Sequence, residues 1–82
     1  MDWNNVTQED VNGMTLSALT ALKMVKAGDT SVISSLQNKT PGGIYGLAIG
    51  MLNLNKVLFD SLVPYSGFSE EEVLDAIERD FS

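Results

Sequence analysis

A long apolar stretch, residues 44–63, constrains the fold of this chain more than any other feature. Placed at about 100° per residue, its apolar side chains cover about half of a helical wheel, while Asn53, Lys56 and Asp60 lie opposite. A face this wide must be contacted from more than one side, so we expect a central helix. The run is broken at Asn53, short of the roughly 20 residues needed to cross a bilayer, so we predict no transmembrane segment. The apolar positions are Ile44, Leu47, Ala48, Met51, Leu52, Leu54, Leu58, Phe59 and Leu62.

Two further helices are expected before this central one. Thr7 is a good N-cap for the first, whose apolar positions recur at helical spacing from residue 11 to residue 25. Gly28 supplies its stop. Asp29 or Thr30 can cap a second, short helix that extends through Leu36.

A fourth helix is expected at the C-terminal side. Pro64 should end the central helix, because proline lacks the N–H that continues a helical ladder. Ser69 and Glu72 then have the spacing of a capping box, and Phe68 is placed to pack onto Val73. We predict a helix over 70–80.

These elements predict an all-α fold, a small compact bundle of three main helices plus one short helix. The 82 residues suffice for a single domain, with residues 1–6 as a flexible N-terminal arm. We expect the first and fourth helices to pack across the apolar half of the central helix. A domain this small, with no disulfide or metal to stabilise it, is also expected to self-associate.

The absence of cysteine and histidine excludes most catalytic chemistry. It removes Cys–His pairs, serine triads, structural zinc and the usual proton shuttle near neutral pH. Lys56 and Ser61, five positions apart, give no support for serine–lysine catalysis. We therefore expect no enzyme, no cofactor and no metal site.

The charge distribution separates the C-terminal segment from the rest. The chain has five basic and eleven acidic residues, a net charge of −6, and six of the acids lie in residues 70–82. The lysines are scattered, so we predict no direct binding of nucleic acid or of an anionic membrane. The N-terminal residues lack the basic-then-apolar pattern of a signal peptide, which favours a cytoplasmic location.

Two features of the central segment are candidate interface residues. Gly46 and Gly50, with Gly42 before them, recur every four residues, a spacing that lets two helix backbones approach closely. The seam they form is either between subunits or inside the chain, where the glycines accommodate bulky neighbours. Asn55 falls within the apolar arc, so its amide should have a hydrogen-bond partner on another helix or subunit.

Three carboxylates, Glu71, Asp75 and Glu78, share one face of the fourth helix. The simplest interpretation is a solvated surface, and a weaker one is a site for a hard cation. A third interpretation is a surface that presents negative charge to the basic groove of a partner.

The sequence therefore favours a non-enzymatic protein–protein interaction module. It is expected to associate with itself, as a homodimer or higher oligomer, through the glycine side or the broad apolar edge of the central helix. The acidic C-terminal helix would remain available to a protein partner. The leading alternative is an acidic inhibitor, a nucleic-acid mimic that blocks a basic nucleic-acid-binding protein. A third possibility is association with a membrane surface through the apolar half of the central helix.

Overall fold

The computed structural model describes all 82 residues and is 73% helical with no strands. The helices are α1 (Gln8–Lys26), α2 (Val32–Leu36), α3 (Gly43–Ser66) and α4 (Glu70–Phe81). The prediction of an all-α bundle with three main helices and one short helix is confirmed.

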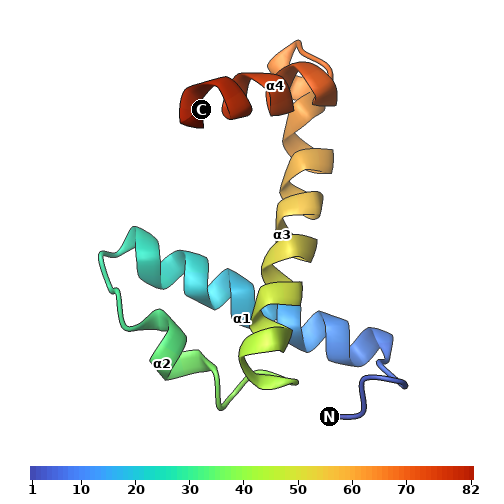
Figure 1. The fold of residues 1–82 in the computed structure, drawn as a ribbon, viewed down its shortest axis with the longest axis vertical. Coiled ribbons are helices and arrows are strands. Elements are labelled where there is room, and N and C mark those ends of the chain that lie inside the picture. Colours follow the sequence, from blue (N-terminus) through green and yellow to red (C-terminus); the bar gives the residue numbers. More distant parts are fainter.

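α3 is the central helix, with α1 and α2 at one of its ends and α4 at the other (Figure 1). α1 crosses the N-terminal half of α3, and α2 packs beside both of them. α4 leaves the other end of α3 at a steep angle and extends over the same side as the C-terminal half of α1. The molecule measures 39 × 32 × 23 Å.

The packing of α4 differs from the expectation. α1 packs extensively on α3, but α4 has few contacts with α3 and none with α1. No residue of α4 is buried. The turn at Gly67, whose φ is 79°, directs α4 away from α3, so its apolar stripe does not lie along the central helix.

The hydrophobic core lies entirely where α1, α2 and the N-terminal half of α3 meet. Two of its residues are alanines on α1, whose small side chains permit close packing of the helix backbones. Both Met14 and Leu47 are almost completely removed from solvent. The buried apolar residues are Met14, Ala18, Ala21, Val32, Leu36 and Leu47.

Local capping chemistry sets the start of two helices. The Thr7 hydroxyl accepts a hydrogen bond from the Asp10 N–H at 3.1 Å, and the Thr7 N–H donates to the Asp10 carboxylate at 3.0 Å. Ser69 and Glu72 form the same reciprocal pair at 3.2 and 3.1 Å. The predicted caps at Thr7 and Ser69 are therefore confirmed.

The predicted start of α2 was wrong. The N-cap is Ser31, not Asp29 or Thr30. The Asp29 carboxylate instead accepts hydrogen bonds from the Ser31 hydroxyl at 2.6 Å and the Ser31 N–H at 2.9 Å. Both bonds stabilise the charged carboxylate and so lower the pKa of the exposed Asp29 below its ordinary value, and the bond from the hydroxyl has the larger effect. Asp29 therefore forms a local turn before α2 instead of capping it.

The predicted end of α3 was also too early. The helix continues through Pro64 to Ser66 and ends at Gly67 in the left-handed conformation. Pro64 cannot donate a hydrogen bond to the carbonyl four residues earlier, and the helix continues for only two residues beyond it. The stop is supplied by Gly67, which adopts a positive φ without a Cβ penalty.

Candidate interaction surfaces

Gly46 and Gly50 lie in a seam within the chain. A Cβ at Gly50 would overlap the carbonyl group of Met14 on α1 and would stand 3.0 Å from the Thr15 nitrogen. A Cβ at Gly46 would overlap the carbonyl oxygen of Pro41, in the loop before α3. Both glycines are buried. The monomer itself occupies the space that these glycines leave, so they offer no free surface to a second subunit.

A side-chain hydrogen bond across the same seam was not predicted from the sequence. The Asn53 amide nitrogen donates to the Thr15 hydroxyl at 2.9 Å, and that hydroxyl donates to the Val11 carbonyl at 2.7 Å. The prediction that Asn53 lies on the outer polar face with Lys56 and Asp60 is therefore wrong. The signal that could have located it is its position three residues after Gly50, which places both on the side facing α1.

Asn55 has a different environment. It is exposed and makes no hydrogen bond within the chain, so the expected partner is not on another helix of the monomer. It lies instead in the middle of a long apolar hollow along the C-terminal half of α3.

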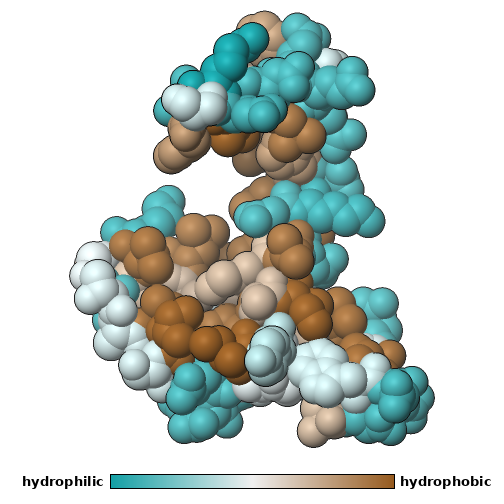
Figure 2. Space-filling model, in the orientation of Figure 1, coloured by the Kyte–Doolittle hydropathy of each residue, from teal (hydrophilic) through white to brown (hydrophobic).

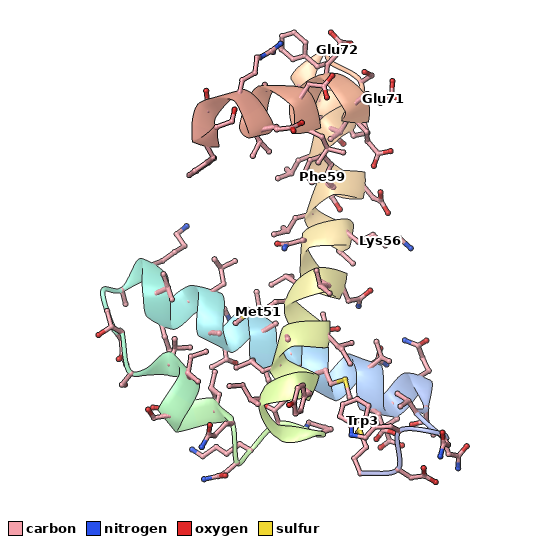
Figure 3. The ribbon with its side chains drawn as sticks, in the orientation of Figure 1. Trp3, Met51, Lys56, Phe59, Glu71 and Glu72 are labelled. Atoms are coloured by element: carbon pink, nitrogen blue, oxygen red, sulfur yellow. The ribbon has the colours of Figure 1, made fainter.

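We call this hollow the spine groove. α1 and α4 form its two walls and α3 forms its floor; in Figure 2 hydrophobic side chains line it between the upper and lower parts of the molecule. Met51 lies on the side next to α1 and Phe59 lies toward the side next to α4 (Figure 3). Its principal residues are Leu22, Val25, Met51, Leu54, Asn55, Leu58, Phe59, Leu62, Val73, Leu74 and Ile77.

Charged groups occur only at the edge of the spine groove. They are Lys56, whose ammonium group extends away from α3 into solvent (Figure 3), and Glu70 at the start of α4. Their charges are opposite in sign, so the groove carries no net charge. A surface of this kind favours an apolar occupant.

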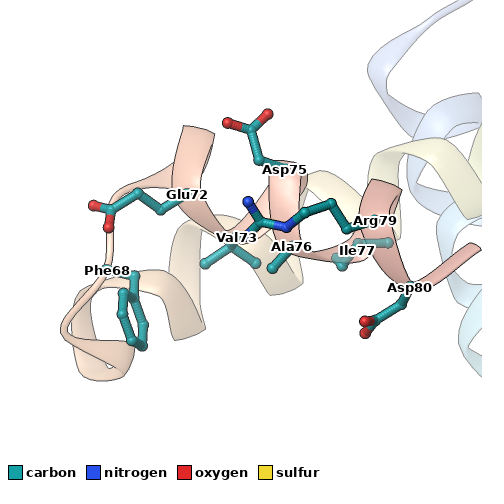
Figure 4. A pocket seen from close by; sticks show the side chains of 8 residues that line it. All are labelled: Phe68, Glu72, Val73, Asp75, Ala76, Ile77, Arg79 and Asp80. Carbon is teal, nitrogen blue, oxygen red and sulfur yellow. The ribbon is translucent and has the colours of Figure 1, made fainter. Parts of the chain in front are cut away.

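The three carboxylates predicted to share one face of α4 do not line the spine groove. Glu71, Asp75 and Glu78 are exposed on α4, and the Asp75 carboxylate points away from the apolar side chains Val73 and Ile77 (Figure 4). No group of three or more acidic side chains is arranged to hold a metal ion. The shallow hollow drawn in Figure 4 is formed by α4 and the preceding turn alone.

A second apolar surface, the aromatic patch, lies elsewhere on the N-terminal half of α3. The ring of Trp3 covers Gly42, so the N-terminal arm is docked on its own domain although 46% of Trp3 remains exposed. That these residues form one surface was not predicted from the sequence. The available signal was the wide apolar arc of α3, which extends beyond the side that α1 covers. The patch consists of Trp3, Tyr45, Ala48, Ile49 and Leu52.

The exposed area is large for a chain of this size. The accessible surface is 6134 Å², whereas a compact monomer of 8.9 kDa exposes about 4,800 Å². The radius of gyration is 14.6 Å, compared with about 12 Å for a compact domain of this length. The excess, about 1,300 Å², reflects the open groove and the projecting α4.

By length and composition alone, α3 could cross a membrane. It has 24 residues, more than the sequence analysis expected, because it extends through Pro64. The helix also carries Lys56 and Asp60, each of which would be costly near the centre of a bilayer. The absence of a transmembrane segment stays a prediction.

Comparisons of the chain with models of protein families, with curated proteins and with solved structures find no match.

Proposed function

We propose that this chain is a non-enzymatic protein–protein interaction module that associates with itself through the apolar spine groove. The observation that carries the proposal is the uncovered apolar surface on the C-terminal half of α3. Leu62, for example, is 61% exposed on a helix whose other half is packed. Large exposed apolar patches are typical of interaction sites in soluble proteins.

The size of the exposed surface supports an interface of ordinary dimensions. A stable complex buries about 800 Å² on each partner, and the excess surface of this chain is about 1,300 Å². The excess surface of one chain is therefore large enough to provide its side of a stable dimer interface. Burial of this surface would also supply the apolar core that the C-terminal half lacks.

The acidic face of α4 supports a further part of the proposal. Glu71, Asp75 and Glu78 are exposed and none of them lines the groove, so self-association through the groove would leave them in solvent. We propose that this face attracts a basic protein partner, because complementary charge accelerates and orients association. The alternative function is an acidic inhibitor, a nucleic-acid mimic whose acidic face blocks a basic nucleic-acid-binding protein.

Light scattering coupled to size exclusion tests self-association. We expect a dimer at low and at high salt, because apolar contacts are not screened by ions. Leu62→Asp should give a monomer with an unchanged helical spectrum. Leu52→Asp is the matched control, since Leu52 is 70% exposed on α3 but belongs to the aromatic patch, and this variant should remain dimeric.

Three outcomes would contradict the proposal in different ways. A wild-type monomer at all concentrations would remove self-association and favour the acidic inhibitor. Loss of the dimer in Leu52→Asp alone would move the interface to the aromatic patch. Flotation of the chain with neutral lipid vesicles, lost in Leu62→Asp, would replace the second copy by a membrane surface.

A further inference from the structure

The spine groove has the width of one additional helix. α1 crosses α3 at Gly50, and Val73 of α4 lines the hollow that also contains Leu62, twelve residues farther along α3. At 1.5 Å per residue, these two points are about 18 Å apart. Packed helices lie 8–10 Å apart, so one helix inserted between α1 and α4 needs about 16–20 Å.

Asn55 lies at the middle of this space. It follows Gly50 by five residues and lines both the part of the groove next to α1 and the part next to α4. Its amide has no partner in the chain, whereas Asn53, two residues earlier, has one on α1. A primary amide both donates and accepts, so two such groups can satisfy each other.

We propose that α3 of a second copy occupies the spine groove, with the two Asn55 amides paired at a twofold axis. This inference rests on the proposed function and specifies its geometry. Each α3 then lies between α1 and α4 of the other copy, and the two α3 helices cross at Asn55. A twofold axis makes both grooves equivalent, so a single contact closes the dimer and leaves neither groove open.

The occupant is a second copy for reasons of area, shape and charge. The excess exposed surface is larger than the area that one partner of a stable dimer buries, and α3 offers uncovered leucines such as Leu58 and Leu62. The groove is neutral, so the acidic chain meets no concentrated like charge there. A single amide within an apolar interface also fixes which residues face each other, because any shift leaves it unpaired.

Cysteine cross-linking tests the axis directly, because the chain has no native cysteine. Asn55→Cys, treated with oxidised glutathione, should form a disulfide-linked dimer, since residues at a twofold axis face their own copies. A disulfide requires the two Cα atoms to be within about 7 Å. Asn38→Cys, an exposed asparagine before α3, is the matched control and should remain uncross-linked under the same conditions.

Charge exchange supplies an independent test. Asn55→Asp and Asn55→Lys should each weaken the dimer by roughly tenfold or more, because like charges would meet at the axis. Mixing the two variants should restore a dimer that contains one copy of each. Asn38→Asp and Asn38→Lys should leave dimerisation unchanged in every combination.

The possible failures are distinguishable. If the wild type is a dimer that Leu62→Asp disrupts, but Asn55→Cys does not cross-link, the groove is the interface and the axis lies elsewhere. If Asn55→Asp and Asn55→Lys each dissociate and their mixture stays monomeric, the two amides do not face each other. A monomeric wild type overturns both the inference and the proposed function.

Discussion

The two halves of α3 belong to one continuous helix, yet only one of them is packed. The N-terminal half carries Gly46 and Gly50, whose missing side chains admit the backbone of α1 and of the preceding loop. The C-terminal half carries leucines on its apolar face and no glycine, and it contains no buried residue. The difference in burial between the two halves shows that an apolar helix face is buried only where another helix or loop packs against it.

The same contrast separates α1 from α4. Both begin with a reciprocal capping box, so their local chemistry is closely similar. α1 has three buried residues and contributes to the core, whereas α4 has none. We therefore expect disturbances in the first region to change global stability and similar disturbances in the second to stay local.

The largest effect is expected from Gly50→Ala. The added Cβ would overlap the Met14 carbonyl, which is backbone and cannot rotate away, so α1 and α3 must separate. Overpacking costs about 1–3 kcal/mol or more, which exceeds the gain of about 1 kcal/mol from alanine in a helix. Chemical denaturation followed by circular dichroism would measure the loss of unfolding free energy.

Gly13→Ala is the control for that substitution. It is also a helical glycine, but its added Cβ would meet only the flexible ring of Pro41 at 3.1 Å. The cost of the small shift that this contact requires is offset by the gain of about 1 kcal/mol from alanine in a helix, so the stability should change little. Equal destabilisation by the two variants would show that the close contact between α1 and α3 at Gly50 has no special effect on stability.

A smaller effect is expected from Asn53→Ala. This change removes the bond to Thr15 and should lower the free energy of unfolding by about 0.5–1.5 kcal/mol. Asn55→Ala, measured at concentrations where the chain is monomeric, should leave that free energy unchanged because Asn55 has no partner in the chain. Equal losses in both variants would contradict the contrast between the two halves of α3.

The two capping boxes give a closely matched pair. Thr7→Ala should lower the global free energy of unfolding by about 1 kcal/mol, because α1 carries much of the core. Ser69→Ala should leave global unfolding nearly unchanged and accelerate hydrogen exchange in the first turn of α4. A global loss in Ser69→Ala would show that α4 is coupled to the core of the isolated chain.

The smallest effect is expected at Asp29, which is fully exposed. Because its pKa is lowered in the folded chain, the turn before α2 is stabilised above the ordinary aspartate range, about pH 4, and loses this contribution as the pH falls through the lowered pKa. The protection of the Ser31 N–H against hydrogen exchange, relative to its intrinsic exchange rate at each pH, should decrease over that interval. Asp29→Asn should remove the pH dependence, and a persistent pH dependence in this variant would contradict the assignment to Asp29.

The sequence located the four helices well, because their signals are local. The hydroxyls of Thr7 and Ser69 accept hydrogen bonds from N–H groups three residues later, and such capping pairs depend only on the first turn of their own helix. The boundaries at Asp29 and Pro64 were wrong because alternative local bonds compete at a turn, and a proline near a helix end can be tolerated. The acidic side chains of α4 are exposed in the structure, as residues opposite an apolar stripe usually are.

What lies against each face of α3 was decided only by the tertiary structure. The spacing of Gly46 and Gly50 predicted a close approach but allowed two partners, and in the structure the partners are the chain's own α1 and the loop before α3. The roles of Asn53 and Asn55 depend on the same choice, because a 200° difference around the helix places one amide on α1 and the other in the open groove. Helical periodicity establishes which residues share a face, whereas the turns at the helix ends determine which of those faces another helix can reach.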